Sequence, residues 1–587
     1  MRTYILLLIS TVLISGCTTP SPTAQLQELM QTYHEETLKM NPIGATYQGD
    51  TRYNDYLPNY LSDDVMRKHK TFYKDILQEL NSIADNSLGE EDQLSKEILK
   101  WECETNLMGM EFPRELLPID QMWTLQLTMG QLATGTGAQP FKTVKDYENW
   151  LSRVDDYVVW LSSAKTRMAE GIEQGVVLPK SLIRKVVPQL ESITEADLEK
   201  NIFYTPARNF PEDFTEGQKE KLSKAYADMV TDKIIPAYQR LVAFMASDYL
   251  AAGRNSSGFD AYSFGEDYYN YAIRLYTTTD MTADEIHQLG LSEVARLRSE
   301  MERIKKQVGF KGDLNAFFDH VRTKKSLMPF DDPQQVIDNF NAIHDKMKAK
   351  VDALFELQPK TAFEVRRVEA FREKSASAHY NPGSLDGTRP GVFYVPIPNV
   401  KEYNVFSDED LFLHEAIPGH HFQISLQQEN TELPDFRKTL WYSSYGEGWA
   451  LYCESLGQEL GLYDDPYQYF GMLSAEMHRA IRLVVDTGLH TKGWTREQAI
   501  AYSLANEAEP KYAITSEIER YMANPGQALS YKIGQLKIRA LRAKAEEALG
   551  DDFDIRAFHR VVLESGCVPL ALLSNKVNAW IASEKKS

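Results

Sequence analysis

Cysteine is scarce in this sequence, and no short-range cysteine pair occurs. The 587 residues contain four cysteines and no C-x-x-C motif. Apart from Cys17, they are Cys103, Cys453 and Cys567, widely spaced along the chain. An oxidising compartment permits one disulfide among these three, with no pairing favoured. The simpler prediction is that all three are buried, small apolar residues.

Basic residues and long apolar runs are also in short supply. The chain has 64 Lys and Arg against 84 Asp and Glu, a net charge of −20. An acidic surface opposes binding to nucleic acid or to an anionic membrane, so we expect no nucleic-acid partner. It favours neutral or basic substrates. Beyond the first twenty residues no apolar run of about 18 residues appears, so the mature chain should be soluble apart from an anchor.

The first residues resemble the leader of a bacterial lipoprotein. A basic residue at position 2 precedes the apolar run 4–14, and small residues lead into Cys17. This resemblance implies a signal peptide at 1–16, lipid on Cys17 and a polar tether at 17–23. Because threonine rather than aspartate follows Cys17, it also implies an outer-membrane anchor facing the periplasm. The alternative is a plain secretory signal with an incidental cysteine.

Apolar residues recur at helical spacing through most of the chain. We expect an N-terminal helical region at 24–280 and a helical metal-site region at 281–587, or one fused domain. The clearest helices are predicted at 65–83, 93–107, 144–174, 216–251, 283–307 and 333–357. Segments 363–368 and 392–396 read as strands, and Pro396 limits the second to an edge or an end. The predicted fold is mainly α, with a cleft and a small β element before the helix that carries His414.

Three of the twelve histidines fall within nine residues. Neutral imidazole is a common zinc ligand, and Glu415 beside His414 can take a proton from metal-bound water. The zinc-protease pattern H-E-x-x-H would place its second histidine where Pro418 stands. The next histidines are His420 and His421, six and seven residues after the first.

An unbroken helix cannot bring either pair to one ion. Six residues rotate the chain by about 600°, and seven separate the side chains by about 10 Å. Pro418 removes a helical hydrogen bond and Gly419 is flexible, so we expect a break between the histidines. This break would return His420 to the position of the second ligand. His421 remains the alternative.

Zinc needs a third protein ligand. The segment Y-G-E-G-W-A-L-Y-C-E contains Glu447 between two glycines and Glu454 on the same helical face seven residues later. Glu447 is the better ligand candidate, because small neighbours suit a close approach. Glu454 would orient a ligand histidine from behind. Two solvated glutamates are the alternative.

These motifs resemble the bacterial family known as domain of unknown function 885. The similar stretches read HEAIPGHHFQ, EGWALYCESL and YNPGSLDGTRPGVFYV, and similarity extends over about 280–566. The family resembles helical, glutamate-ligand zinc metallopeptidases, including thermostable carboxypeptidases. The resemblance implies one zinc ion per chain, held by His414, His420 and Glu447, with Glu415 as general base.

Other residues are candidates for supporting roles. The glutamine of the family motif corresponds to Gln423. Tyr531 and His490 each lie near a glycine and are candidate donors to a tetrahedral oxyanion. Arg482 would bind a substrate carboxylate, or alternatively pair with Asp486 one helical turn away. Ordinary structural roles are the alternative for each.

The segment 392–396 would align an extended peptide as an edge strand, with Arg389 and Tyr394 flanking the cleft. Together these features predict a zinc metallopeptidase, carboxypeptidase- or oligopeptidase-like, acting on a peptide or small amide. The alternatives are a non-catalytic ligand-binding lipoprotein and a metal-dependent hydrolase of another amide or an ester. The intact H-E pair argues against the binder, which would not need Glu415.

Overall fold

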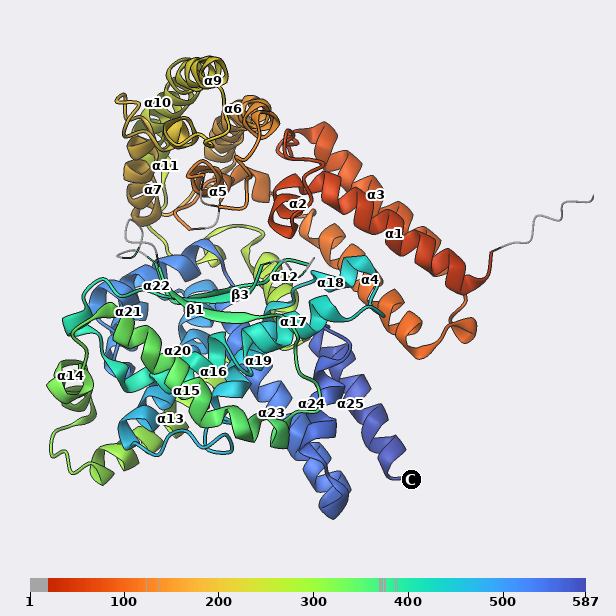
Figure 1. Ribbon diagram of the computed structural model, residues 1–587, viewed down its shortest axis with the longest axis vertical. Coiled ribbons are helices and arrows are strands. Elements are labelled where there is room, and N and C mark those ends of the chain that lie inside the picture. The colour runs from red at the N-terminus through yellow and green to blue at the C-terminus, as the bar shows by residue number, and fades with distance from the viewer. Residues whose placement is uncertain are drawn as a thin grey trace, which may run out of the picture.

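The computed structural model is built almost entirely of helices and contains one small sheet (Figure 1). It describes residues 20–586 apart from positions 123, 136, 369–372, 374–375, 386 and 388. The expected signal peptide and the lipidation site Cys17 lie outside these described residues. The prediction of a mainly helical chain with a small β element is confirmed.

Four helices at the N-terminal end form an arm along one side of the molecule (Figure 1). They are α1 (Pro22–Met40), α2 (Pro42–Gln48), α3 (Asp63–Ser82) and α4 (Glu90–Gly109). The side chain of Ser21 accepts a hydrogen bond from the backbone of Ala24, and Pro22 occupies the first turn of α1, where it has no donor to lose. The last two residues of the expected tether are therefore helical.

The next helices form a lobe, drawn in orange to yellow in Figure 1. They are α5 (Leu125–Leu132), α6 (Val144–Gln174), α7 (Lys180–Ile193), α8 (Thr205–Arg208), α9 (Glu216–Asp228), α10 (Ile235–Phe244) and α11 (Leu250–Ala252). Two π-helical segments, Met229–Ile234 and Met245–Tyr249, join α9, α10 and α11 into one continuous rod. The long helix predicted at 216–251 is this rod.

The remaining elements make up the body. Its helices are α12 (Gly265–Thr277), α13 (Ala283–Gln307), α14 (Leu314–Thr323), α15 (Pro333–Leu354), α16 (Asp408–Glu415), α17 (His420–Glu429), α18 (Asp435–Lys438), α19 (Ser443–Glu454), α20 (Pro466–Thr491), α21 (Arg496–Asn506), α22 (Lys511–Ala523), α23 (Ser530–Leu549), α24 (Ile555–Leu563) and α25 (Leu570–Glu584). Short 3-10 turns lie at Asp85–Ser87, Arg114–Leu116, Ile202–Tyr204, Phe259–Ala261, Lys325–Leu327, Val400–Glu402, Val405–Ser407, Gln527–Leu529 and Gly550–Asp552.

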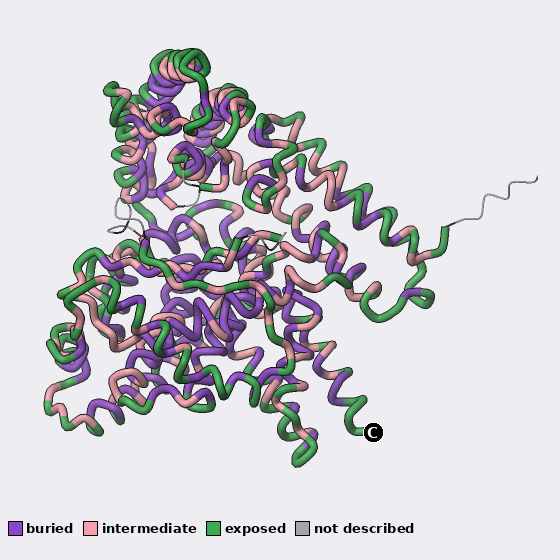
Figure 2. Tube along the Cα trace, viewed as in Figure 1, coloured by how far each residue is buried: buried purple, intermediate pink, exposed green. Residues whose placement is uncertain are grey.

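Two hydrophobic cores underlie this arrangement, and Figure 2 shows their buried residues in purple. One core fills the lobe. The other fills the body and also takes in the arm, including Leu26 and Leu99. Helix α12 lies between them, since Tyr269 packs into the body core while Tyr268 and Ala272 pack into the lobe core. The arm therefore packs with the C-terminal half of the chain, although it precedes the lobe in sequence.

The sheet has the strand order β1-β3-β2, with β1 (Phe363–Arg367), β2 (His379–Asn381) and β3 (Gly391–Val395). Strand β3 pairs in parallel with β1 and antiparallel with β2, so it is the central strand. The expectation that 392–396 forms an edge strand is wrong. Pro396 stands just beyond the last paired residue, so it ends the strand without interrupting its hydrogen bonds. The edge belongs instead to β2, a three-residue strand inside a turn-rich segment.

The remaining cysteines are buried as free thiols at Cys103, Cys453 and Cys567, as predicted. The helices of the described residues are too short or too polar to cross a membrane.

Candidate metal centre

The stretch that carries the histidines forms two helices separated by a sharp turn. Helix α16 ends at Glu415 and α17 begins at His420. Between them the backbone leaves the helical conformation, with φ −108° and ψ −107° at Ala416 and φ −73° and ψ −130° at Gly419. The predicted break is confirmed. It places His414 at the end of one helix and His420 at the start of the next.

The turn passes so close to α16 that position 419 has room only for glycine. A Cβ on Gly419 would lie 1.9 Å from the carbonyl oxygen of His414 and 2.3 Å from that of Leu413. Both distances are far inside van der Waals contact, and backbone atoms cannot swing aside as a flexible side chain can. Gly419 therefore allows the chain to fold back over the end of α16 and return the second histidine to the first.

His414, His420 and Glu447 converge, with one ligand atom from each lying within 4.8 Å of the others. Glu447 Oε2 is 3.6 Å from His414 Nε2 and 3.4 Å from His420 Nε2. Three ligands with bonds of ~2.1 Å at tetrahedral angles stand about 3.4 Å apart. The donor set and its spacing thus fit a zinc ion with one position left open.

Glu454 stands behind His414 and orients its ring. Glu454 Oε1 is 2.7 Å from His414 Nδ1, so Nδ1–H donates to the carboxylate and Nε2 is left for the ion. Asp410 lies close by in the same buried pocket. Burial and the charge of Glu454 raise the pKa of Asp410 well above its ordinary value.

Two carboxylates make His414 strongly basic in the protein alone. Burial by itself lowers the pKa of His414, but hydrogen bonds with Glu447 and Glu454 outweigh burial and raise the pKa to about 10. Burial alone would raise the pKa of Glu447, yet the hydrogen bonds from His414 and His420 hold it far below its usual range. A site that stabilises positive charge so strongly is suited to a divalent cation in place of the proton.

Helix α19, which carries Glu447, is tied directly to the turn between the histidines. The indole Nε1–H of Trp449 donates to the carbonyl oxygen of Pro418 at 2.8 Å. On another face α19 crosses α23 at very short range, because a Cβ on Gly448 would lie only 2.4 Å from the Cα of Gly534. The glycines that flank the glutamate in the sequence are thus packing requirements.

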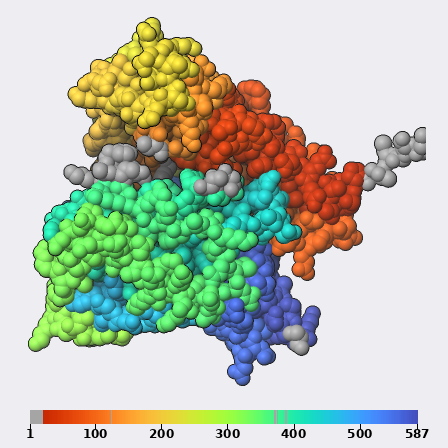
Figure 3. Space-filling view, in the orientation of Figure 1, coloured from red at the N-terminus to blue at the C-terminus, as the bar shows by residue number. Residues whose placement is uncertain are grey.

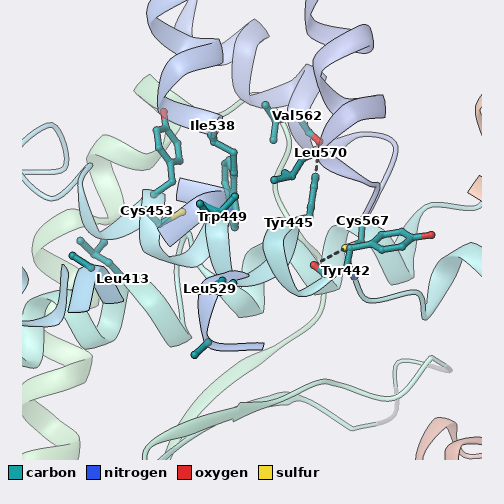
Figure 4. Close-up of a cluster of buried hydrophobic side chains, with 14 of the residues drawn as sticks. Leu413, Tyr442, Tyr445, Trp449, Cys453, Leu529, Ile538, Val562, Cys567 and Leu570 are labelled. Atoms are coloured by element: carbon teal, nitrogen blue, oxygen red, sulfur yellow. Dashed lines mark hydrogen bonds between the residues drawn. The ribbon is translucent and has the colours of Figure 1, made fainter. Parts of the chain in front are cut away.

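Apolar packing and two more hydrogen bonds hold α19 in place (Figure 4). The hydroxyl of Tyr445 donates to the carbonyl oxygen of Val562 at 2.6 Å, and the Sγ–H of Cys567 donates to the carbonyl oxygen of Tyr442 at 3.7 Å. Around them the side chains labelled in Figure 4 are buried: Leu413, Trp449, Cys453, Leu529, Ile538 and Leu570. The ligand helix is therefore part of the body core.

His421 faces the sheet and lies outside the metal group. Its Nδ1 is 3.0 Å from the hydroxyl of Tyr380, and its ring packs 4.9 Å from that of Phe363. Burial lowers the pKa of His421 to about 4. The structure favours His420 over His421 as the ligand, because only His420 converges with His414 and Glu447, while the His421 ring points to the sheet.

Gln423 lies one turn further along α17 and supports the same region. Its Nε2 donates to Gln427 Oε1 at 2.9 Å. Gln427 in turn donates to the carbonyl oxygens of Arg437 and Leu440 at 2.7 and 3.0 Å. This buried amide chain fixes α17 to the segment that leads into α19.

Glu415 is the last residue of α16 and has an exposed fraction of only 8%. Among the described residues no side chain or backbone group makes a hydrogen bond or ion pair with its carboxylate. Both oxygens are therefore available beside the metal group, as a general base requires.

Tyr531 and Arg482 approach the group from α23 and α20. The guanidinium of Arg482 lies 4.5 Å from the centroid of the Tyr531 ring. Burial and the nearby carboxylate of Glu447 raise the pKa of Tyr531, so its hydroxyl keeps its proton and can donate it in a hydrogen bond. Tyr531 therefore remains a candidate oxyanion donor.

Arg482 already has protein partners. Its Nε donates to the Tyr521 hydroxyl and its Nη2 to Glu517, both at 3.0 Å, while its Nη1 has no partner among the described residues. The alternative ion pair with Asp486 is wrong, because that carboxylate accepts from the Tyr269 hydroxyl at 2.6 Å instead. The contact of Arg482 with a substrate carboxylate stays a prediction, and Nη1 is the atom left to make it.

His490 is held by the backbone at both ring nitrogens, which favours a structural role over the predicted donation to an oxyanion. Its Nδ1 accepts from the backbone N–H of Phe259 at 3.0 Å, and its Nε2–H donates to the carbonyl oxygen of Tyr521 at 3.0 Å. Both ring nitrogens are thus used by the backbone, and the side chain has no exposed surface. Its nearby glycine, Gly488, gives space to the Trp494 ring and not to a substrate.

A cleft of about 1440 Å³ lies between the lobe and the sheet side of the body, which face each other in Figure 3. Arg389 and Tyr394 line it, as predicted, and so do His379 and Asn381 of the edge strand β2. The lining also includes Trp441.

Trp441 also lies at the site, although the sequence analysis did not identify it. Its indole lies 5.7 Å from the ring of His420 and is 43% exposed. A Cβ on Gly446 would meet this indole at 2.1 Å. The glycine before Glu447 was therefore the available signal, since it exists to seat an aromatic ring beside the site.

Comparison with known proteins extends these observations. The family described as "Bacterial protein of unknown function (DUF885)" matches residues 42–577. No curated protein gives a significant match. The crystal structure of a "putative lipoprotein" from Colwellia psychrerythraea is 29% identical, with a TM-score of 0.89, and the match covers 96% of this chain and 100% of that one.

A second structure, described as a "putative lipoprotein of unknown function" from Shewanella oneidensis, shares the fold. It is 19% identical with a TM-score of 0.74, and the match covers 95% of this chain and 99% of that one.

Replacing Gly419 by alanine should disrupt the histidine turn. Because the new Cβ meets two carbonyl oxygens, we expect the free energy of unfolding to fall by about 1–3 kcal/mol and zinc affinity to fall at least about tenfold. Denaturant unfolding and zinc titration measure both effects. Gly217→Ala in α9 is the matched control, since its Cβ would meet nothing within 4 Å. A Gly419→Ala variant that behaves like this control contradicts the role assigned to the glycine.

His490 should contribute to stability in a pH-dependent way. Burial lowers its pKa to about 3, while a histidine in an unfolded chain titrates near ~6.5. Between these values the unfolded chain takes up a proton that the folded chain excludes, so the unfolding free energy falls as pH falls. For His490→Gln we expect a lower unfolding free energy than that of the wild type at pH 8. Between pH 8 and pH 5 the unfolding free energy should fall by about 2 kcal/mol less in the variant than in the wild type. The zinc content should be unchanged. Lost peptide cleavage with unchanged stability would restore the catalytic role.

Proposed function

We propose that this chain, which belongs to the DUF885 family, is a zinc-dependent hydrolase of peptide bonds. The observation that carries the proposal is the convergence of His414, His420 and Glu447 at the spacing of tetrahedral zinc ligands, with Glu454 fixing one imidazole from behind. Two histidines and one glutamate leave an open coordination position, which is typical of catalytic rather than structural zinc.

The residues around the group take distinct roles. A bound zinc ion supplies Lewis-acid activation of a water molecule at near-neutral pH. The free carboxylate of Glu415 accepts the proton of that water and passes it to the leaving amine. Tyr531, protonated because burial and Glu447 raise its pKa, donates a hydrogen bond to the oxygen on which negative charge develops.

An extended peptide can be aligned by the edge of the sheet. Strand β2 pairs on one side with β3, and its residues His379 and Asn381 line the cleft. Its outer backbone groups can therefore add a substrate strand, which supports a peptide over a compact small molecule. This role passes to β2 from the central strand β3. Carboxypeptidase and oligopeptidase action both fit this approach.

We further propose that the protein works in the bacterial cell envelope, anchored by lipid on Cys17 at the outer membrane and facing the periplasm. The lipobox-like leader supports this placement, and so does the description of the Colwellia relative as a "putative lipoprotein".

Elemental analysis of the purified protein should find about one zinc per chain. Alanine in place of His414, His420 or Glu447 should abolish stoichiometric zinc, because each removes one of three ligands. The matched control is His421→Asn, which changes the neighbouring histidine that faces the sheet and should retain zinc. Loss of zinc in the control with retention in His420→Ala would reverse the ligand assignment.

Replacing Glu415 by glutamine should remove the base and leave the ligands intact. We expect zinc content to stay at one per chain and kcat on peptides to fall by about 10²–10⁴. Mass spectrometry of a peptide-library digest gives the cleavage positions and the rates. Glu402→Gln, at an exposed glutamate shortly before α16, should cleave at the wild-type rate. Equal cleavage by the Glu415→Gln variant would exclude the general-base role.

A further inference from the structure

The charge of the cleft is opposite in sign to that of the whole protein. Of the 587 residues 84 are acidic, about one in seven, and at that frequency the 39 described lining residues would include five or six. Among them there is neither aspartate nor glutamate, whereas Lys142, Arg389 and Lys438 are present.

The cationic side chains stand on both walls of the cleft. Lys142 belongs to the lobe, just before α6, while Arg389 precedes β3 in the body. Both residues are exposed, and neither side chain forms an ion pair within the described part of the chain. Lys438 at the end of α18 is paired with Asp435 at 2.8 Å. Two cations therefore remain available to a ligand, one from each side.

The rest of the lining suits a peptide. It includes seven glutamines, of which Gln131 is exposed and Gln48, Gln189 and Gln428 are partly exposed. Side-chain amides offer both donors and acceptors, as a peptide backbone requires. Tyr47, Leu385 and Trp441 add apolar surface, with exposed fractions of 51%, 45% and 43%. Exposed aromatic and aliphatic side chains within a concave surface are typical of binding sites.

We propose that the cleft selects peptides with acidic side chains, and that Lys142 and Arg389 recognise the carboxylate. This proposal rests on the proposed peptidase function and names its substrate class. A protein of net charge −20 repels an acidic peptide at long range, so local positive charge is needed to admit one. The positive charge of a cleft with amide and apolar walls acts close to the bound peptide, where solvent screens it least.

Free-ended hexapeptides that differ only in a central glutamate, glutamine or lysine isolate the side-chain charge, because their termini are identical. With zinc-loaded wild-type protein we expect kcat/KM for the glutamate peptide to exceed that for the glutamine peptide by about fivefold or more, and the lysine peptide to be the poorest. The preference should shrink as salt is added. In the Lys142→Glu, Arg389→Glu double variant the order of glutamate and lysine should reverse.

The controls reverse charge at sites outside the cleft. Lys311→Glu and Arg556→Glu change exposed residues that form no ion pair in the described chain and do not line the cleft. Together they make the same change in net charge as the double variant. They should keep the wild-type order of substrates. An equal shift in both double variants, or a wild-type preference for lysine, overturns the proposal.

Binding separates this proposal from the peptidase assignment. Fluorescence anisotropy of the labelled glutamate and lysine peptides with zinc-loaded Glu415→Gln protein reports affinity without cleavage. If wild-type protein cleaves neither peptide but Glu415→Gln binds the glutamate peptide more tightly, the peptidase assignment fails and the selectivity of the cleft stands. If it binds both peptides equally or neither, the selectivity fails, whether or not the wild type cleaves them.

Discussion

The hydrogen bond from the Trp449 indole to the carbonyl oxygen of Pro418 is the contact on which the site depends. It joins the helix that carries Glu447 to the turn that separates the two histidines. The Sγ–H of Cys453, on the same helix, adds a weaker bond to the same carbonyl oxygen at 3.5 Å. The same helix reaches His414 again through Glu454. One turn of chain and one helix are thus held together at two points, and the space between them is the size of a metal ion.

Much of this could be read from the sequence because local chemistry fixed it. The helices predicted at 283–307 and 333–357 begin as expected, each after a capping side chain, and the predicted break at Pro418-Gly419 is present. The candidate ligands His414, His420 and Glu447 came from motif residues shared with the family, and the structure brings these three side chains together. For His490 the sequence could not separate two roles. A histidine near a glycine looks the same whether its ring bonds backbone groups in the core or donates to a substrate. Strand β2 was not predicted, because a strand of three residues forms only through pairing with β3, and local sequence does not reveal that pairing.

The net charge of the whole chain does not describe the charge of the cleft. A total of −20 describes the average surface and suggested neutral or basic ligands. The cleft draws its lining from more than ten short segments between Gly44 and Trp441, and no window of sequence contains that selection. Its composition, rich in amides and free of described acids, exists only after folding. Trp441 belongs to the same class of residue, since only the missing side chain at Gly446 pointed to it.

Helix α12 packs on both hydrophobic cores, so the two sides of the cleft can change separately during evolution. The lobe side of the cleft packs on the lobe core, and the helices that carry the candidate ligands pack on the body core through Leu413, Phe422 and Trp449. Substitutions in the lobe core can therefore change the lobe side of the cleft while the residues that pack around His414, His420 and Glu447 stay the same. Relatives can therefore differ in the molecules that their clefts bind while they keep the same candidate metal group. Such a division suits a scaffold that serves many environments with one reaction.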